Sequence, residues 1–295
     1  MSAEITLFVN PTAGRGRGAH AAQPAASALR AAGFCVRTVV GNDAADALAR
    51  LRTAVREGTG AVIAVGGDGM VSLALQALAG TLVPLGVVAV GTGNDFARSL
   101  GLPVRDPARA GRLAAGALKE SRIREIDLGR AGGTWYGTVL CSGFDSRVND
   151  RGNRMRLPLG RFKYDLAIAL ELAAFKPLPC RITLDDGPVI ETEATLVAVG
   201  NGTSYGGGMR ICADAVPDDG LFDVTVVGDC GRATLLKVFP QVYKGTHLTH
   251  PKVTVHRAAK VTLEAPGLTA YADGEPLGPL PVTAECVPGA VRLLT

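Results

Sequence analysis

Glycine-rich loops that alternate with apolar and helix-like segments constrain the fold of this chain more than any other feature. Three such loops cover residues 10–18, 66–69 and 91–94. Short apolar runs predict strands at residues 5–9, 35–40, 61–65 and 85–90. Helices are expected at about 19–32, from the cap Asp43 to about 57, from the second loop to about 78, and from Asp95 onward. Strands joined by crossover helices form a parallel sheet with helices on both faces.

The second half of the chain has a different pattern, in which Gly and Pro turns separate short segments. Strands are expected at 123–128, 135–141, 181–184, 194–199, 222–227 and 261–263, and helices at about 162–175 and 232–242. Many short strands with such turns favour an antiparallel sandwich. We therefore predict an α/β nucleotide-binding domain at residues 1–121 and a β-sandwich accessory domain at 122–287. A C-terminal tail of about 288–295 is expected to be able to return to the first domain.

The composition excludes several classes of protein. Hydrophobic residues make up 47% of the 295 and charged residues 20%, so the chain can bury a full core and is not disordered. A net charge of +4 is too small for the basic field of a nucleic-acid binder. The six cysteines include no C-x-x-C pair, which argues against a zinc site or disulfide scaffold and favours reduced, mostly buried thiols.

The sequence shows neither a signal peptide nor an apolar stretch of about 18 residues, the length that a membrane span needs. We therefore expect a cytoplasmic protein that meets any lipid substrate at a membrane surface. A homodimer is compatible with the sequence, which does not determine the oligomeric state.

The three glycine-rich loops are expected to meet at one edge of the sheet, because ligands of parallel α/β sheets bind at the carboxyl ends of the strands. Free backbone N–H groups at the helix starts favour phosphate there. Neither a Walker A loop nor a complete dinucleotide fingerprint is present. Asp68 would repel phosphates unless a cation lay between them, so it indicates Mg²⁺. The alternative is a turn or helix-cap aspartate.

Several segments resemble a known family. The G-G-D-G at 66–69 resembles the nucleotide motif of diacylglycerol kinases, sphingosine kinases, NAD kinases and phosphofructokinases. Residues 84–86 (P-L-G) and 91–98 (G-T-G-N-D-F-A-R) are similar to a segment of the lipid kinase branch. Segments similar to its accessory domain follow in family order, at 143–145, 201–202, 205–211, 218–224 and 273–276.

The resemblance extends from residue 9 to about 276, nearly the whole chain. It implies an NAD kinase- or phosphofructokinase-like α/β domain followed by an antiparallel β-sandwich. ATP would be the co-substrate, Mg²⁺ the metal, and a membrane lipid the acceptor, most closely diacylglycerol.

The resemblance also implies roles for individual residues. Those that would line the ATP site are Asn10, Gly14, Thr38, Gly66, Gly67, Asp68, Gly69, Met70, Val71, Ser72, Thr92 and Asn94. Asp68 and Asp95 would position the nucleotide and its magnesium ion, and Asp127 would join them from the first sandwich strand. Glu275 would be the general base that takes the proton of the lipid hydroxyl. Without the resemblance, the Asp273-Gly274 pair favours a simple hairpin turn.

Residues 216–221 resemble a structural magnesium loop of the family. There the backbone carbonyls of Val216 and Leu221 and the carboxylate of Asp219 would hold the ion, with water completing an octahedron. An acidic turn without a metal is the alternative.

Three positions depart from the family pattern. Met70, Ser72 and Leu73 stand where the family has Thr and then Asn-Glu. Because the Thr hydroxyl is a plausible phosphate contact, alternatives to a diacylglycerol kinase stay open. They are a sphingosine or other long-chain-alcohol kinase, an NAD kinase, which the segments after Gly86 oppose, and a catalytically weakened nucleotide- or lipid-binding regulator.

Basic residues cluster just before the helix expected at 162–175. They are Arg151, Arg154, Arg156, Arg161 and Lys163. Near an anionic leaflet each basic residue contributes about 1 kcal/mol, so the cluster could dock the protein on the inner face of the membrane. A solvated loop beside a core helix explains the same pattern equally well.

Overall fold

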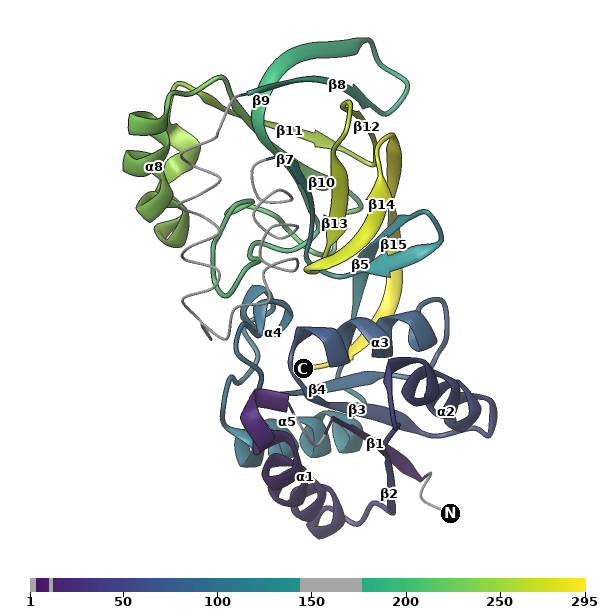
Figure 1. The fold of residues 1–295 in the computed structure, drawn as a ribbon. Coiled ribbons are helices and arrows are strands. Elements are labelled where there is room, and N and C mark those ends of the chain that lie inside the picture. Colours follow the sequence, from purple (N-terminus) through teal and green to yellow (C-terminus); the bar gives the residue numbers. More distant parts are fainter. Residues whose placement is uncertain (1–3, 11–12, 144–176) are drawn as a thin grey trace.

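The computed structural model describes residues 4–10, 13–143 and 177–295, and it contains an α/β unit followed by a β-sandwich (Figure 1). The fold class predicted from the sequence is therefore confirmed. The basic cluster and the helix expected at 162–175 lie outside the described residues.

The α/β unit is a parallel sheet with the strand order β4-β3-β1-β2. Its elements are β1 (Ile5–Val9), α1 (Ala13–Ala31), β2 (Val36–Val39), α2 (Ala44–Arg56), β3 (Ala61–Gly66), α3 (Asp68–Leu78), β4 (Leu85–Ala89), α4 (Asp95–Ser99) and α5 (Pro107–Glu120). Side chains of β1 alternate between two cores: Ile5 and Leu7 pack with α1 and α5, and Phe8 packs with α2 and α3. Every residue of β1, β3 and β4 is buried, as expected for strands covered on both faces.

Helix α1 begins earlier than the sequence predicts. The expected start was near residue 19, but the helix starts at Ala13, so the glycines at 14, 16 and 18 lie in its first turns instead of in a loop. The low helix propensity of glycine caused the error. At Gly18 the reason for glycine is steric, because a β-carbon there would lie 1.9 Å from the carbonyl oxygen of Asn10.

The sandwich follows, with strands that run mostly antiparallel. Its elements are β5 (Ile123–Ala131), β6 (Thr134–Tyr136), β7 (Val139–Gly143), β8 (Leu178–Leu184), β9 (Val189–Gly200), β10 (Phe222–Gly228), α8 (Arg232–Lys244), η1 (Thr246–Thr249), β11 (Val253–Ala258), β12 (Lys260–Glu264), β13 (Thr269–Ala272), β14 (Glu275–Pro279) and β15 (Val282–Leu294). The first half of β9 pairs with β8, and its second half pairs with β7 and β10. This long strand therefore joins the two layers of the sandwich, whose shared core contains Tyr136 and Phe222.

Two differences from the sequence prediction bear on function. The strand expected at 135–141 is two strands, β6 and β7, separated at Gly137 and Thr138. The hairpin of β13 and β14, which the pattern of short apolar runs did not predict as strands, turns at Asp273 and Gly274, both with positive φ. This hairpin places the first residue of β14, Glu275, next to the α/β unit.

Strand β15 belongs to both units. Its first part pairs with β12 and β5. After a bulge that follows Val287 it continues to pair with β5, and Leu293 also pairs in parallel with Leu85 of β4. The last strand of the chain thus extends the sheet formed by the first four. Within the described part of the chain, no helix combines the length and the apolar character needed to cross a membrane.

Candidate active site

The glycine-rich loops after β3 and β4 open into one cleft, which also receives Glu275 from the sandwich. The cleft has a volume of about 540 Å³. Its lining residues come from the end of β1, the starts of α1, α2 and α3, the loops after β3 and β4, and the β14 hairpin: Asn10, Ala13, Ala44, Gly67, Gly69, Met70, Ser72, Leu73, Gly91, Thr92 and Glu275. Residues far apart in the sequence therefore share one cavity at the carboxyl edge of the parallel sheet.

The two loops are in backbone contact. A β-carbon on Gly91 would lie 2.4 Å from the Cα of Gly67, a distance that no side chain can occupy. Gly67 is also the N-cap of α3, so the positive end of this helix points at the cleft. A phosphate chain can approach such a surface closely because neither glycine carries a side chain.

Asp68 lies at the first position of α3, where it ties the two loops together. Its carboxylate accepts hydrogen bonds from the backbone N–H groups of Asn94 (2.7 Å) and Phe96 (3.2 Å), at the start of α4. The cap role considered as an alternative is therefore present. A β-carbon on Gly93 would lie 2.8 Å from Oδ2 of Asp68 and 3.0 Å from Oδ2 of Asp95, so both carboxylates converge on this glycine.

Asp95 lies in α4 with its side chain buried between the two units. Oδ2 accepts a hydrogen bond from the Gly207 N–H (2.7 Å), which belongs to the sandwich. Oδ1 is buried and has no hydrogen-bond partner among the described residues. Burial, with a smaller contribution from the nearby charge of Asp68, raises the pKa of Asp95 to about 6. An unpaired carboxylate oxygen beside a second carboxylate fits a divalent cation, so the residues present are suited to Mg²⁺.

Glu275 is exposed and faces the glycine-rich loops from the tip of the β13–β14 hairpin. The turn that precedes it is the hairpin turn that the Asp273-Gly274 pair predicts without any family resemblance. The hairpin turn and the glutamate at the cleft are thus compatible with each other. The hairpin carries the carboxylate to the cleft.

The other predicted nucleotide residues are distributed unequally around the cleft. Asn10, Gly67, Gly69, Met70, Ser72 and Thr92 line it. Three others contact the residues that line the cleft or lie beneath them. A β-carbon on Gly66 would meet the side chain of Met70 at 2.6 Å, and Val71 is buried in the core. Nδ2 of Asn94 donates to the Gly91 carbonyl. Gly14 lies in the first turn of α1. Thr38 lines a separate hollow of about 560 Å³ between β2 and α2.

The predicted structural magnesium loop does not fit a metal on Asp219. One oxygen of the Asp219 carboxylate is paired with the Arg257 guanidinium, and the other accepts a hydrogen bond from the Leu221 N–H (3.0 Å). The same guanidinium contacts buried Asp223 at 3.2 Å. A side-chain cation therefore occupies the carboxylate that was expected to share an ion with the carbonyls of Val216 and Leu221.

Asp127 is hydrogen-bonded to this loop. Its carboxylate accepts hydrogen bonds from the N–H groups of Gly220 (2.7 Å) and Gly289 (2.8 Å). It joins the 216–221 loop to the bulge of β15. The place of Asp127 in the nucleotide site therefore stays a prediction, and its carboxylate hydrogen bonds are with this loop and the bulge.

Sequence reasoning assigned no separate role to two residues near the cleft, Gln76 and Asp273. Asp273 accepts hydrogen bonds from Gly137 and Thr138, and Gln76 binds the backbone of Trp135. An aspartate at a turn position often binds nearby backbone N–H groups, so Asp273 carried a weak local signal. Gln76 carried none, because its partner is distant in the sequence.

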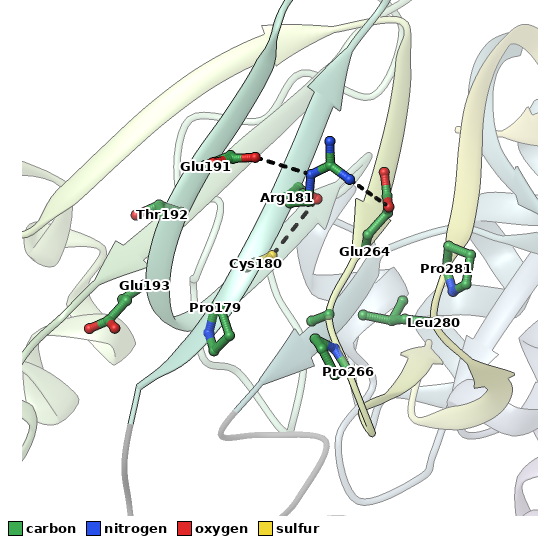
Figure 2. A pocket seen from close by; sticks show the side chains of 11 residues that line it. Pro179, Cys180, Arg181, Glu191, Thr192, Glu193, Glu264, Pro266, Leu280 and Pro281 are labelled. Atoms are coloured by element: carbon green, nitrogen blue, oxygen red, sulfur yellow. Dashed lines mark hydrogen bonds and ion pairs between the residues drawn. The ribbon is translucent and has the colours of Figure 1, made fainter.

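A larger hollow, of about 680 Å³, lies on the sandwich between β8, β9 and β12 (Figure 2). Its walls include Pro179, Cys180 and Leu280. Three of the charged side chains around it are paired, since Arg181 contacts Glu191 (3.4 Å) and Glu264 (3.6 Å). Of the groups described above for phosphate or metal binding, none lies on this surface.

Comparison with known proteins matches both units. Residues 4–131 match the diacylglycerol kinase catalytic domain, and residues 138–295 match the YegS C-terminal NAD kinase beta sandwich-like domain. The chain is 44% identical to a diacylglycerol kinase of Mycobacterium tuberculosis, over 99% of this chain and 94% of that protein. It is 31% identical to a YegS-like lipid kinase of Stenotrophomonas maltophilia, over 84% and 82% of the two chains.

Solved structures agree with this match. A diacylglycerol kinase structure from Bacillus anthracis superposes with a TM-score of 0.74 at 25% identity, covering 99% of this chain and 96% of that one. An NAD kinase from Archaeoglobus fulgidus in complex with ATP shares the fold, with a TM-score of 0.56 at 12% identity over 100% and 94% of the chains. With a catalytic domain and a YegS-type sandwich in the same order, the chain belongs to the diacylglycerol kinase family of lipid kinases.

Proposed function

We propose that this protein transfers the γ-phosphoryl group of ATP to the hydroxyl of a membrane lipid, with diacylglycerol as acceptor and phosphatidate as product. The observation that carries the proposal is the position of Glu275, which faces the two glycine-rich loops across the cleft. A phosphate-binding backbone and a carboxylate base are the two parts that such a transfer needs on opposite sides of the reacting phosphorus.

In this proposal the triphosphate lies along the N–H groups at the start of α3 and in the loop after β4. Asp68 and Asp95 would hold Mg²⁺, which neutralises the charge of the phosphates. Glu275 takes the proton of the lipid hydroxyl while the oxygen of that hydroxyl attacks the γ-phosphorus. The bond between the γ-phosphorus and the oxygen of the leaving ADP breaks. A carboxylate is an adequate base, because phosphoryl transfer depends mainly on positioning and electrostatics.

The diacylglycerol acceptor is the finer part of the proposal. It is supported by the 44% identity to a protein named diacylglycerol kinase across nearly the whole chain. We propose that the protein meets this lipid at the cytoplasmic face of an anionic membrane. Met70 and Leu73, which line the cleft where the family has polar residues, favour a regulator with weakened catalysis as the second candidate.

The test is ATP turnover on detergent-dispersed lipids, with diacylglycerol, sphingosine and a long-chain alcohol as acceptors. We expect phosphorylated diacylglycerol and a drop in kcat of about 10²-fold or more in Glu275→Gln, as for loss of a general base. Turnover that is independent of Glu275 would overturn the base assignment. ATP binding without turnover on any acceptor would favour the regulator.

A further inference from the structure

The tip of the β13–β14 hairpin is held by the side chain of its own turn residue. Asp273 Oδ2 accepts a hydrogen bond from the Gly137 N–H (2.8 Å). Oδ1 accepts two more, from the N–H (2.9 Å) and the hydroxyl (2.5 Å) of Thr138. These three bonds join the turn to the point where β6 ends and β7 begins. Two residues further along the chain is Glu275.

Strand pairing also connects the hairpin to the sandwich. β13 pairs with β7 through Tyr271 and Ala272, and β14 is the edge strand of the described sheet. Glu275 itself is exposed. The Asp273 N–H also donates to the Val139 carbonyl (3.1 Å), so backbone pairing holds the hairpin to β7 and the side chain of Asp273 holds its turn to residues 137–138.

The segment that receives Asp273 is packed directly against the nucleotide-binding unit. A β-carbon on Gly137 would lie 2.6 Å from the ring of Phe96 in α4 and 2.9 Å from Cδ1 of Leu75 in α3. Only a glycine allows this close approach. The β6–β7 break is thus fixed against the two helices that follow the glycine-rich loops.

Gln76 adds a directional contact to this packing. Its Oε1 accepts a hydrogen bond from the Trp135 N–H (3.0 Å), and its Nε2 donates to the Trp135 carbonyl (2.7 Å). The amide thereby binds both backbone groups of one residue, as a neighbouring strand would. Because Gln76 belongs to the helix that begins at Asp68, a shift of β6 relative to the phosphate-binding end of α3 would break both bonds.

We propose that Gln76 and Asp273 are positioning residues, which together set the distance between Glu275 and the nucleotide loops. The contacts run from α3 through Gln76 to Trp135, then through Gly137 and Thr138 to Asp273. Glu275 comes from one unit and the phosphate site from the other, so their relative position has to be fixed across the interface. A misplacement of about 1 Å can reduce a rate by about a hundredfold. This inference rests on the proposed role of Glu275 as the base.

The test combines Gln76→Met and Asp273→Asn with Glu275→Gln in double-mutant cycles. Methionine keeps the length of the glutamine side chain without its hydrogen bonds, and asparagine presents an N–H₂ group to the Gly137 N–H. We expect each single substitution to lower kcat by about tenfold to a hundredfold, with the KM and Kd for ATP unchanged. Neither should lower the rate further when Glu275 is already glutamine.

Matched control variants are available for both substitutions. Gln241→Met removes an amide that, among the residues described, donates to the Lys237 carbonyl of its own helix α8. Asp185→Asn changes another turn aspartate with positive φ that accepts two backbone N–H groups, those of Ala259 and Lys260, at the β8–β9 turn. Both controls should keep the wild-type kcat.

Losses that add to that of Glu275→Gln, or equal losses in ATP affinity, would overturn the positioning role. A second measurement does not depend on activity. In Asp273→Asn the amides of Gly137 and Thr138 should exchange hydrogen faster, and in Gln76→Met the fluorescence of Trp135, the single tryptophan, should change. If these signals stay as in the wild type, the contacts do not fix the hairpin, and the inference fails.

If they change while Glu275→Gln has no effect on turnover, the proposed base is wrong instead.

Discussion

The Cα of Gly67 and the backbone of Gly91 touch, which joins the loops after β3 and β4 into one surface. A β-carbon on Gly91 would approach the Cα of Gly67 to 2.4 Å. The lining of the cleft on this side therefore depends on two residues that have no side chain. This contact gives the first prediction.

Gly91→Ala should push the two loops apart and weaken ATP binding at least about tenfold. Overpacking of this kind also destabilises a protein by about 1–3 kcal/mol. Titration calorimetry with MgATP and chemical unfolding measure the two effects. Gly231→Ala, at the N-cap of α8 with nothing within 4 Å of the new carbon, is the control. Unchanged ATP affinity in Gly91→Ala would show that the loops do not bind the nucleotide.

Asp95→Asn should separate stability from activity. The wild-type carboxylate has a buried oxygen without a partner in the described structure, and its charge lies close to Asp68. Removing that charge should leave the Tm of the nucleotide-free protein equal or higher. Turnover with MgATP should fall by about a hundredfold, because a proposed ligand of the ion that neutralises the reacting phosphates is lost. Calorimetry and a kinase assay test this pair of effects, and a lower Tm with full turnover would contradict it.

Acid should destabilise the protein partly through His247. The ring is fully buried, and Nε2 lies 3.0 Å from the Ile211 carbonyl oxygen, so Nε2 carries the proton. Burial lowers the pKa of His247 in the folded state. The unfolded chain binds a proton near pH 6.5 and the folded chain only at lower pH, so stability is lost as the pH falls below about 6.5. Between pH 7.5 and 5.5 the Tm of His247→Gln should fall less than that of the wild type; equal slopes would exclude this residue.

Arg257→Met should lower the Tm, because the carboxylates beside β10 then lack a positively charged partner. Burial raises the pKa of Asp223, and the Arg257 guanidinium opposes this shift. Loss of the guanidinium leaves Asp223 buried and unpaired next to Asp219, so the Tm should fall by several degrees. Added Mg²⁺ should recover part of this loss by binding the two freed carboxylates.

The measurement is best made in an Asp95→Asn background, which removes the other candidate ion site. There, EDTA should not change the Tm of protein that retains Arg257. Arg292→Met, which breaks an exposed pair with Glu125, is the control and should have a small effect. A Tm that falls in EDTA while Arg257 is present would mean that Asp219 does hold a metal.

The sequence predicts most of the architecture because local patterns determine it. Buried runs such as residues 61–65 and the cap Asp43 lie where they were expected, and Asp43 accepts a hydrogen bond from the Asp46 N–H. The start of α1 was misplaced because glycines argue locally against a helix, whereas Gly18 is required by its contact with Asn10.

Long-range contacts explain what could not be predicted at the site. Asp273 and Thr138 are 135 positions apart, and their hydrogen bond divides the single strand expected at 135–141 into β6 and β7. Arg257 lies in β11, which no strong pattern indicated, so its ion pair with Asp219 was not foreseen. Residue types suggest which groups can react, but the pairing of distant strands decides which of them meet.

The parallel pairing of Leu293 with Leu85 has a consequence for how this protein is made. On a ribosome, β4 leaves the exit tunnel long before β15 has been translated. Until then one edge of the nascent α/β unit exposes unpaired backbone groups, a known template for aggregation. Synthesis of β15 both covers that edge and brings the sandwich against it, so the two units should acquire their final stability in the same late step.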